Sequence, residues 1–188
     1  MKVRLLGISD SWQNIKNAAM NTMGKEEGVY PSSLWKRRLL LCEHSPIRKL
    51  KISWKWIDLK SWISVHFVRH KLGIEHFVST QRTDRTGIDR NALRQDELVS
   101  HECEGNAQAM IFISRRRLCG CASPETRDAW KAVLESIKER EPELYSVCVP
   151  DCIYRGYCYE YKSCNHFRTD AFKYELERYR SNINEIHE

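Results

Sequence analysis

No other stretch of this sequence is as dense in side chains suited to bind phosphate as the one between Phe67 and Arg85. It contains the consecutive residues Arg69, His70 and Lys71, followed by Ser79, Thr80 and Arg82. Guanidinium groups match phosphate oxygens two at a time and stay charged. Three consecutive basic side chains cannot share one face of a helix or strand, so we expect them where an element ends and the backbone turns toward a ligand. The competing interpretation is a solvated basic helix end.

A second group with ligand chemistry is the cysteine cluster near the end of the chain. Four of the eight cysteines follow the pattern Cys-x3-Cys-x5-Cys-x5-Cys, at Cys148, Cys152, Cys158 and Cys164, with four tyrosines among them. This segment has little aliphatic core of its own and needs another source of order. We predict that the four thiolates bind zinc or a [4Fe-4S] cluster; the alternative is free thiols packed on the main domain.

Two further cysteines, Cys119 and Cys121, flank Gly120. Their spacing is short for a metal chelate. Because free cysteine is often simply buried, three interpretations remain open: buried inert thiols, an active-site thiol, or metal ligands.

Length and composition describe an ordinary globular protein. The chain has 188 residues, 41% hydrophobic and 30% charged, which predicts one main domain without forced disorder. The net charge of +6 favours anionic partners, either nucleotides or nucleic acid. No apolar run approaches the ~20 residues of a membrane span, and the start lacks a secretory pattern, so we expect a cytoplasmic protein whose cysteines are reduced.

Periodicity predicts the elements that must position these groups. We expect strands at residues 2–6 and 49–57 and helices at 12–23, from Pro31 to about His44, 58–70, 96–118, 124–140 and 169–179. Leu50, Ile52, Trp54 and Trp56 should form the buried side of the second strand, because they alternate with polar residues. Residues 83–91 read as a loop. The fold class is therefore mixed α/β (α+β), with a main domain over 1–145 and a cysteine-rich extension with a charged, solvated tail helix over 146–188.

Three blocks of this sequence resemble the flavin-dependent thymidylate synthase family. Arg69-His70-Lys71, followed by Ser79 or Thr80, is similar to the family's Arg-His-Arg-x7-8-Ser signature. Upstream, His44-Ser45-Pro46 is similar to its His-x-Ser/Thr-Pro segment. Downstream, Asn106-Ala107 through Arg117 and Ala122 to Arg127 resemble its paired helices. The match covers roughly residues 32–140 and its blocks lie in the family's order.

The resemblance implies a homotetrameric methyltransferase of nucleotide biosynthesis that makes dTMP. It implies that FAD is reduced by NADPH and that dUMP is methylated at C5 with methylenetetrahydrofolate as the one-carbon donor. The implied substrate-binding residues are Arg69, Ser79, Thr80, Arg82 and Arg117, with Ser79 and Arg117 catalytic. The implied flavin-binding residues are His44, Ser45, Arg69, His70, Lys71 and Asn106. Arg115 and Arg116 are interpreted as helix C-terminal charges, which the dipole favours by about 0.3–1 kcal/mol.

Two alternative functions remain open at this point. Lys71 stands where the family usually has a second Arg, and Cys121 and Gln108 replace a family His and Arg, which motivates a flavin enzyme with a different pyrimidine or a hydroxymethyl product. The positive net charge and the tyrosine-rich segment that holds the C-terminal cysteines motivate the second alternative, a metal-knuckle protein that binds nucleic acid.

Overall fold

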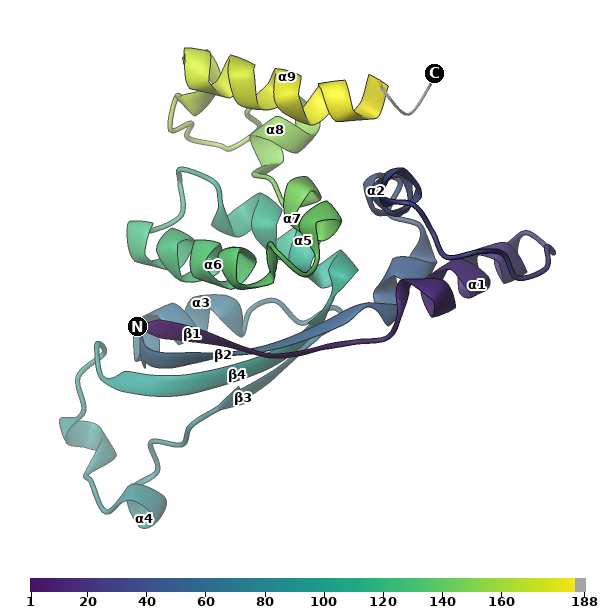
Figure 1. The fold of residues 1–188 in the computed structure, drawn as a ribbon. Helices are drawn as coiled ribbons and strands as arrows, with labels where there is room; N and C mark the ends of the chain where they lie inside the picture. Colours follow the sequence, from purple (N-terminus) through teal and green to yellow (C-terminus); the bar gives the residue numbers. More distant parts are fainter. Residues whose placement is uncertain (185–188) are drawn as a thin grey trace.

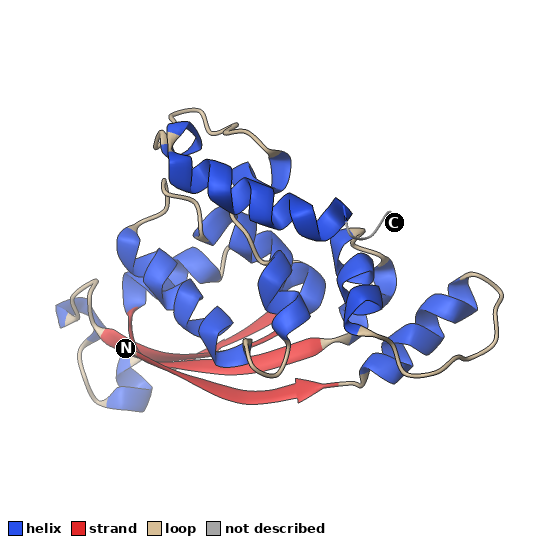
Figure 2. Cartoon of the chain, turned by 45° about the horizontal axis from the view of Figure 1, so that its top comes forward, coloured by secondary structure: helices blue, strands red, loops and turns tan. Residues whose placement is uncertain are grey.

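The computed structural model describes residues 1–184 and contains one antiparallel sheet. Its strands are β1 (Lys2–Ser9), β2 (Lys51–Lys60), β3 (Ile74–Val78) and β4 (Leu98–Asn106). They lie in the order β1-β2-β4-β3, and each neighbouring pair is antiparallel. The predicted mixed α/β class is confirmed, with the strands in a single sheet and the helices around it (Figures 1 and 2).

Helices precede, interrupt and follow these strands. They are α1 (Trp12–Thr22), α2 (Ser33–Leu41), α3 (Ser61–Phe67), α4 (Thr83–Thr86), α5 (Ala107–Arg117), α6 (Pro124–Ile137), α7 (Pro142–Val147), α8 (Asp151–Arg155) and α9 (Asp170–Asn184). Short 3₁₀ helices are η1 (Ser45–Lys49), η2 (Arg90–Ala92) and η3 (His166–Arg168). None of the described helices is both long and apolar enough to span a membrane.

Helices α3, α5, α6 and α7 lie on one face of the sheet, and α8 and α9 lie beyond α5 and α6 (Figure 1). Helices α1 and α2 extend from one end of the molecule. The opposite face of the sheet carries cross-strand ion pairs: Lys51 Nζ lies 2.8 Å from Glu104 Oε1, and Lys55 Nζ lies 3.7 Å from Glu102 Oε2. Alternation of apolar and charged residues along β2 and β4 therefore separates a core face from a solvated face.

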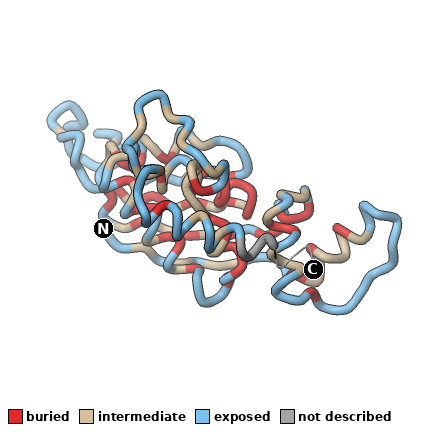
Figure 3. Tube along the Cα trace, turned by 90° about the horizontal axis from the view of Figure 1, so that it is seen from above, coloured by how far each residue is buried: buried red, intermediate tan, exposed pale blue. Residues whose placement is uncertain are grey.

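Aromatic side chains form the centre of the core between sheet and helices. Trp54, Trp56, Trp130 and Phe67 are all fully buried. The Trp56 and Phe67 rings stack at 4.5 Å between centroids, and Trp54 meets Trp56 edge-on at 5.6 Å. Burial of such side chains stabilises a fold by about 1.5–3 kcal/mol each. Figure 3 shows buried segments running through the middle of the molecule, with exposed loops at its ends.

The predicted long helix at 96–118 is wrong in its first half, which is strand β4. Val99, Cys103 and Ala107 are spaced by four residues, a spacing that satisfies both a helical stripe and one face of a strand. His101 and Gly105 decide between the two, since they lie midway between those residues and are also buried. The alternating burial of β4 is the two-residue period of a strand, and the helix begins only at Ala107.

Smaller differences surround the basic stretch. Asp58 does not cap a helix; it lies within β2 at φ 57°, where the β2–β4 register shifts, and α3 follows at Ser61 and ends at Phe67. Strand β3 was not expected. The predicted loop at 83–91 contains α4 and part of η2.

Other differences lie toward the two ends of the chain. Strand β1 continues past Gly7 to Ser9, and Leu34, expected in the buried stripe of α2, is exposed. The tail helix is longer than predicted and buries Phe172, so it is not simply solvated. Helices α1, α2 and α6 and the buried face of β2 are confirmed.

Candidate functional site

The basic residues Arg69 to Lys71 lie in the turn between α3 and β3, as their spacing predicts. Helix α3 is capped at Val68, whose N–H donates to the Ser64 carbonyl at 3.1 Å. The turn ends at Gly73, which adopts φ 72° and accepts a hydrogen bond from the Asn106 backbone N–H at 2.8 Å. This geometry exposes Arg69 and Lys71 and leaves His70 half-buried.

Arg117 of α5 reaches this turn from a position 47 residues later in the chain. Its Nε donates to His70 Nε2 at 2.9 Å, and its Nη2 donates to the His66 carbonyl at 2.6 Å. Burial, and then Arg117, lower the pKa of His70 to about 4, so this imidazole is neutral and accepts the guanidinium proton. Burial and the nearby charge of Arg69 lower the pKa of Arg117. The structure thus brings Arg69, His70 and Arg117 together.

The two neighbouring arginines are engaged elsewhere. Arg115 forms a salt bridge with Glu43, and its guanidinium lies 3.6 Å from the Tyr154 ring centroid. Arg116 pairs with Glu160 at 3.1 Å. No ion pair joins Arg117 to a carboxylate among residues 1–180. Arg117 therefore keeps a positive charge available to an anion.

Ser79, Gln81 and Arg82 line a cavity of about 290 Å³ at the end of β3. Ser64 and Val65 of α3, its C-cap Val68, Arg90 and Val99 also line it. Buried Gln81 Nε2 has no hydrogen-bond partner among the described residues. An unpaired buried donor beside arginines favours a ligand that carries acceptor atoms.

The hydroxyl groups of Ser79 and Thr80, which follow β3, have local partners. Ser79 Oγ accepts a hydrogen bond from the Ser100 N–H at 3.0 Å, which leaves its own proton free to donate. Thr80 Oγ1 accepts from the Arg82 N–H at 3.2 Å. The Arg82 guanidinium makes two hydrogen bonds with Asp84, at 2.9 and 2.7 Å, but remains largely exposed.

The remaining residues assigned by resemblance to flavin lie at element ends. His44 precedes η1, and exposed Ser45 is its first residue. His44 Nδ1 is buried without a hydrogen-bond partner in the described part of the chain. Asn106 is the N-cap of α5, where its Oδ1 accepts from the Ala109 N–H at 2.9 Å. Asn106 therefore has a clear structural role beside the basic turn.

The C-terminal cysteines divide into two places. Cys152, Cys158 and Cys164 line a small cavity of about 10 Å³, together with Cys119 and His166. Cys148 does not line this cavity; it is buried in the main core and lines the larger cavity under α9. Burial raises the pKa of Cys148 to about 12 and that of Cys152 to about 11.

A further cluster, not expected from the sequence, lies under β3 and β4: His76, His101 and Cys103. Burial, and then His76, lower the pKa of His101 to about 4, and burial raises the pKa of the Cys103 thiol well above its ordinary range. The alternation of buried residues along 99–105 would have revealed His101 and Cys103 as neighbours on one strand face. Their pairing with His76 required the unpredicted strand β3.

Comparisons by sequence give no match, either to a family profile or to a curated protein. Comparison by structure does. ThyX, the flavin-dependent thymidylate synthase of Helicobacter pylori complexed with FAD and dUMP, superposes with a TM-score of 0.66 at 11% identity, over 79% of this chain and 100% of that chain. A second crystal structure of that enzyme with FAD and dUMP gives 0.65 at 12% identity, over 79% and 99%.

Another similar structure is the UMP/dUMP methylase PolB from Streptomyces cacaoi bound with 5-Br dUMP. Its TM-score is 0.60 at 14% identity, over 78% of this chain and 93% of that chain. These identities show the fold alone. The chain therefore has the fold of the flavin-dependent thymidylate synthases, as the resemblance of its motifs implied.

Proposed function

We propose that the chain is a flavin-dependent enzyme that methylates dUMP at C5. The observation that carries this proposal is the meeting of Arg69, His70 and Arg117 at one turn, within a fold shared with ThyX over 79% of this chain and 100% of that chain. Those residues come from two of the three sequence blocks that resemble the thymidylate synthases. A metal-knuckle protein that binds nucleic acid is not favoured, because the cations gather at a turn beside a cavity.

FAD is the cofactor that this function needs, and the residues near the turn fit an anionic flavin nucleotide. The buried, unpartnered Nδ1 of His44 is a polar atom that a ligand can satisfy. Lys71 and Ser45 are exposed and free to contact cofactor phosphates, with His70 and Asn106 nearby as further contacts. When bound, the reduced flavin supplies hydride to the one-carbon unit.

Arg69 and Arg117 bind the nucleotide phosphate in this proposal. Both lie at the basic turn, and the pKa of Arg117 is lowered by burial and by Arg69, which indicates two positive charges held near each other. A bound dianion relieves that repulsion. Arg82 and Thr80 contribute at the rim of the cavity, where Arg82 exchanges part of its pairing with Asp84 for the ligand.

Ser79 acts on the pyrimidine. Its oxygen already accepts the Ser100 N–H, so its hydroxyl proton is directed to another acceptor, such as a pyrimidine carbonyl. No histidine or carboxylate hydrogen-bonds to this hydroxyl among the described residues, which argues against a nucleophilic serine. Polarisation of the ring by Ser79, with the phosphate held by Arg117, is the catalytic contribution that the chain itself makes.

The same proposal includes methylenetetrahydrofolate as donor, NADPH as reductant, a homotetramer and a cytoplasmic location. It also includes a structural metal held by the C-terminal cysteines. Cys152, Cys158 and Cys164 gather at one cavity, which supports ligation by those three.

The test is mass analysis of the product from dUMP, methylenetetrahydrofolate and NADPH with the FAD-loaded protein. We expect a nucleotide heavier than dUMP by one methylene group. Ser79→Ala should retain flavin absorbance and lose most turnover, while Thr83→Ala, at the start of the nearby helix α4, serves as the matched control. A hydroxymethylated product, or turnover of UMP but not dUMP, would contradict the proposed reaction, and absence of flavin binding would contradict the enzyme class.

A further inference from the structure

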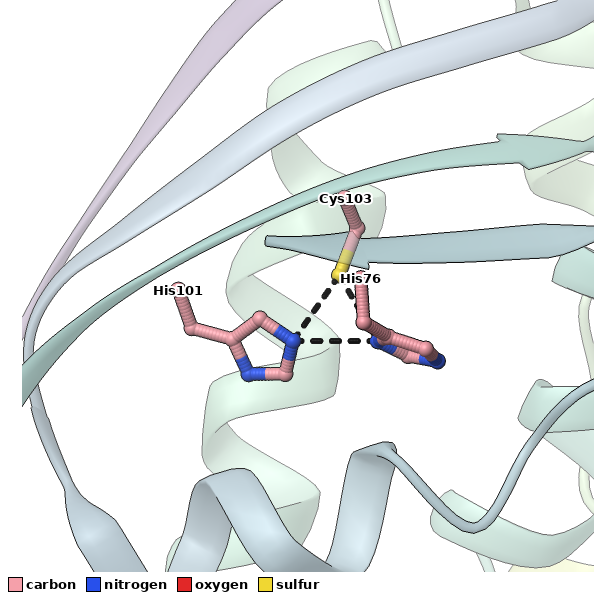
Figure 4. Close-up of side chains that lie close together, drawn as sticks. All are labelled: His76, His101 and Cys103. Carbon is pink, nitrogen blue, oxygen red and sulfur yellow. Dashed lines mark hydrogen bonds between the residues drawn. The ribbon is translucent and has the colours of Figure 1, made fainter. Parts of the chain in front are cut away.

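Three ligand-type side chains meet beneath the sheet at β3 and β4 (Figure 4). His76 pairs directly opposite Cys103 in the antiparallel register, and His101 lies two residues before Cys103. All three side chains therefore project from the same face of the sheet, the face covered by helices. His101 and Cys103 are fully buried, and His76 is partly exposed.

Their ligand atoms converge on one point. His76 Nδ1 lies 3.0 Å from His101 Nε2, and Cys103 Sγ lies 3.3 Å from His76 Nδ1 and 3.2 Å from His101 Nε2. In the described part of the chain, these three residues form the cluster of histidine, cysteine or acidic side chains whose ligand atoms all lie within 4.8 Å of one another. The dashed lines of Figure 4 mark two of these contacts clearly and the third in part.

The other nitrogen of each histidine is held from outside the cluster. His76 Nε2 lies 2.8 Å from the His70 carbonyl oxygen, which only accepts, so Nε2 carries the proton and a neutral ring points the Nδ1 lone pair at the cluster. His101 Nδ1 lies 3.0 Å from the Ser64 hydroxyl, which accepts when Nδ1 is the protonated nitrogen. Outer contacts of this kind orient metal-binding histidines.

We propose that His76 Nδ1, His101 Nε2 and Cys103 Sγ bind a zinc ion. A tetrahedral zinc with Zn–N of about 2.0–2.1 Å and Zn–S of about 2.3 Å places its ligand atoms about 3.3–3.6 Å apart. The three observed separations reach this range with shifts of a few tenths of an ångström. Imidazole and thiolate select zinc over magnesium or calcium, which prefer oxygen.

Zinc also resolves a conflict within the cluster. When Ser64 accepts from His101 Nδ1, two nitrogen lone pairs face each other at 3.0 Å, and the single thiol proton can satisfy only one of them. A cation at the centre satisfies both. The three protein ligands leave a fourth position that a water can fill.

None of the cluster's ligand atoms has a role in the proposed methylation, and the cluster touches that site only through the contact of His76 Nε2 with the His70 carbonyl. It is also distinct from the C-terminal cysteines, which lie around α8. Two metal sites in one chain require a test that separates them. Cobalt is suitable as a zinc substitute because a bound thiolate gives it a charge-transfer absorbance.

The experiment measures zinc per chain and zinc affinity, by competition with a chelator, in the full-length protein. Cys103→Ala and His76→Gln should each weaken zinc binding at this site by at least about tenfold, because even the loss of an outer-shell partner costs about 10–100-fold. The control is Cys42→Ala, which removes an exposed thiol elsewhere. Far-ultraviolet circular dichroism checks that each variant is folded, and Cys103→Ser replaces Cys103→Ala where that check fails.

The cobalt spectrum then assigns the site. We expect that part of the thiolate charge-transfer band disappears in Cys103→Ala and persists in Cys152→Ala. A band that depends on Cys152 alone, or zinc content and affinity unchanged in both Cys103→Ala and His76→Gln, would overturn the proposal and leave the three side chains as a hydrogen-bonded cluster.

Discussion

Three successive arginines at the end of α5 have three different partners because each residue of a helix is rotated by about 100° from the one before. Arg115 turns toward Glu43 and Tyr154, Arg116 toward Glu160, and Arg117 toward His70 and the His66 carbonyl. One basic triplet therefore contacts the segment after α2, helix α8 with the segment after it, and the turn between α3 and β3. Only its last member lies among the other cations of the candidate site.

This division predicts different effects for two neighbouring substitutions. Arg117→Ala should weaken nucleotide binding by at least about tenfold, since a charge-assisted hydrogen bond is worth about 1.5–3 kcal/mol. Arg116→Ala removes the same side chain one position earlier and should change the dissociation constant little. Isothermal titration with dUMP measures both. Equal affinities in the two variants would remove Arg117 from the site.

At the residue scale, the sequence was sufficient to place the functional side chains that lie within one short motif. Arg69, His70 and Lys71 are consecutive, so their position at a turn followed from their spacing. The link from Arg117 to His70 came only from the resemblance, because 47 residues separate them. The cluster of His76, His101 and Cys103 could not be predicted from the sequence, because no local pattern links residue 76 to residues 101 and 103.

At the scale of elements, Gly73 controls how the basic turn meets helix α5. Its φ of 72° is a conformation that costs an L-residue about 1–2 kcal/mol. A Cβ atom at Gly73 would also lie 2.6 Å from Asn106 Nδ2, the side chain that caps α5. The turn and the helix start are therefore coupled through one contact.

Gly73→Ala should destabilise the protein more than Gly87→Ala does. Gly87 has nearly the same φ, 73°, but no atom within 4 Å of an added Cβ, so it isolates the backbone cost. The additional loss at Gly73 is the displaced Asn106 cap, about 0.5–2 kcal/mol. Urea unfolding of both variants measures the difference. If the two free energies of unfolding fall equally, the contact with Asn106 has no energetic weight.

Glu141 fastens α1 to the region between α6 and α7. Its Oε2 accepts a hydrogen bond from the Trp12 indole N–H at 2.8 Å, and both side chains are buried. Burial raises the pKa of Glu141 above its ordinary value of 4.5, while the Trp12 hydrogen bond opposes that shift. The folded protein therefore holds the Glu141 proton more tightly than the unfolded chain.

The sign of the pH effect follows from that shift. The unfolded chain loses this proton first, so wild-type stability falls as pH rises from below 4.5 through the raised pKa. Glu141→Gln keeps an acceptor for Trp12 without a charge, and its advantage over the wild type should appear on going from pH 4 to pH 7. Glu141→Ala leaves the indole N–H unpaired and should cost about 1–3 kcal/mol. Denaturant unfolding at several pH values measures the stability advantage of Glu141→Gln over the wild type, with exposed Glu139→Gln as the control. An advantage of Glu141→Gln that does not grow with pH would contradict the prediction.

The elements that sequence periodicity located correctly are those with an unambiguous stripe. Helix α6 begins at Ser123-Pro124 and buries Ala129, Trp130, Val133 and Leu134, a spacing that only a helix explains. The prediction for β4 was wrong because its apolar residues are spaced by four, which also fits a helix. The residues that distinguish a strand from a helix there are His101 and Gly105. Tertiary pairing with β2 on one side and β3 on the other determined its conformation.

At the scale of the whole molecule, the C-terminal segment is tied to the rest of the chain through the α5–α6 connection. Cys121 Sγ donates to the Lys162 carbonyl at 3.3 Å, and a Cβ added at Gly120 would lie 2.7 Å from Cys164 Sγ. Cys119 from this connection lines the small cavity with Cys152, Cys158 and Cys164. Tertiary structure thus offers a fourth thiol that spacing within residues 148–164 did not suggest.

The metal proposed for the C-terminal cysteines should therefore depend on Cys119 rather than Cys148. Cys148 is the natural matched control, since it belongs to the predicted four-cysteine pattern but lies in the main core away from the small cavity. A closed set of four thiolates stabilises a fold by the binding free energy of the ion. Cys119→Ser and Cys158→Ser should each lose one zinc, or the four irons of one [4Fe-4S] cluster, per chain and should have a lower melting temperature, whereas Cys148→Ser should keep the metal. Elemental analysis of the anaerobically purified proteins decides between the two ligand sets. If Cys148→Ser loses the metal and Cys119→Ser retains it, the set predicted from the sequence is correct. If the wild-type protein contains no metal, both sets are excluded.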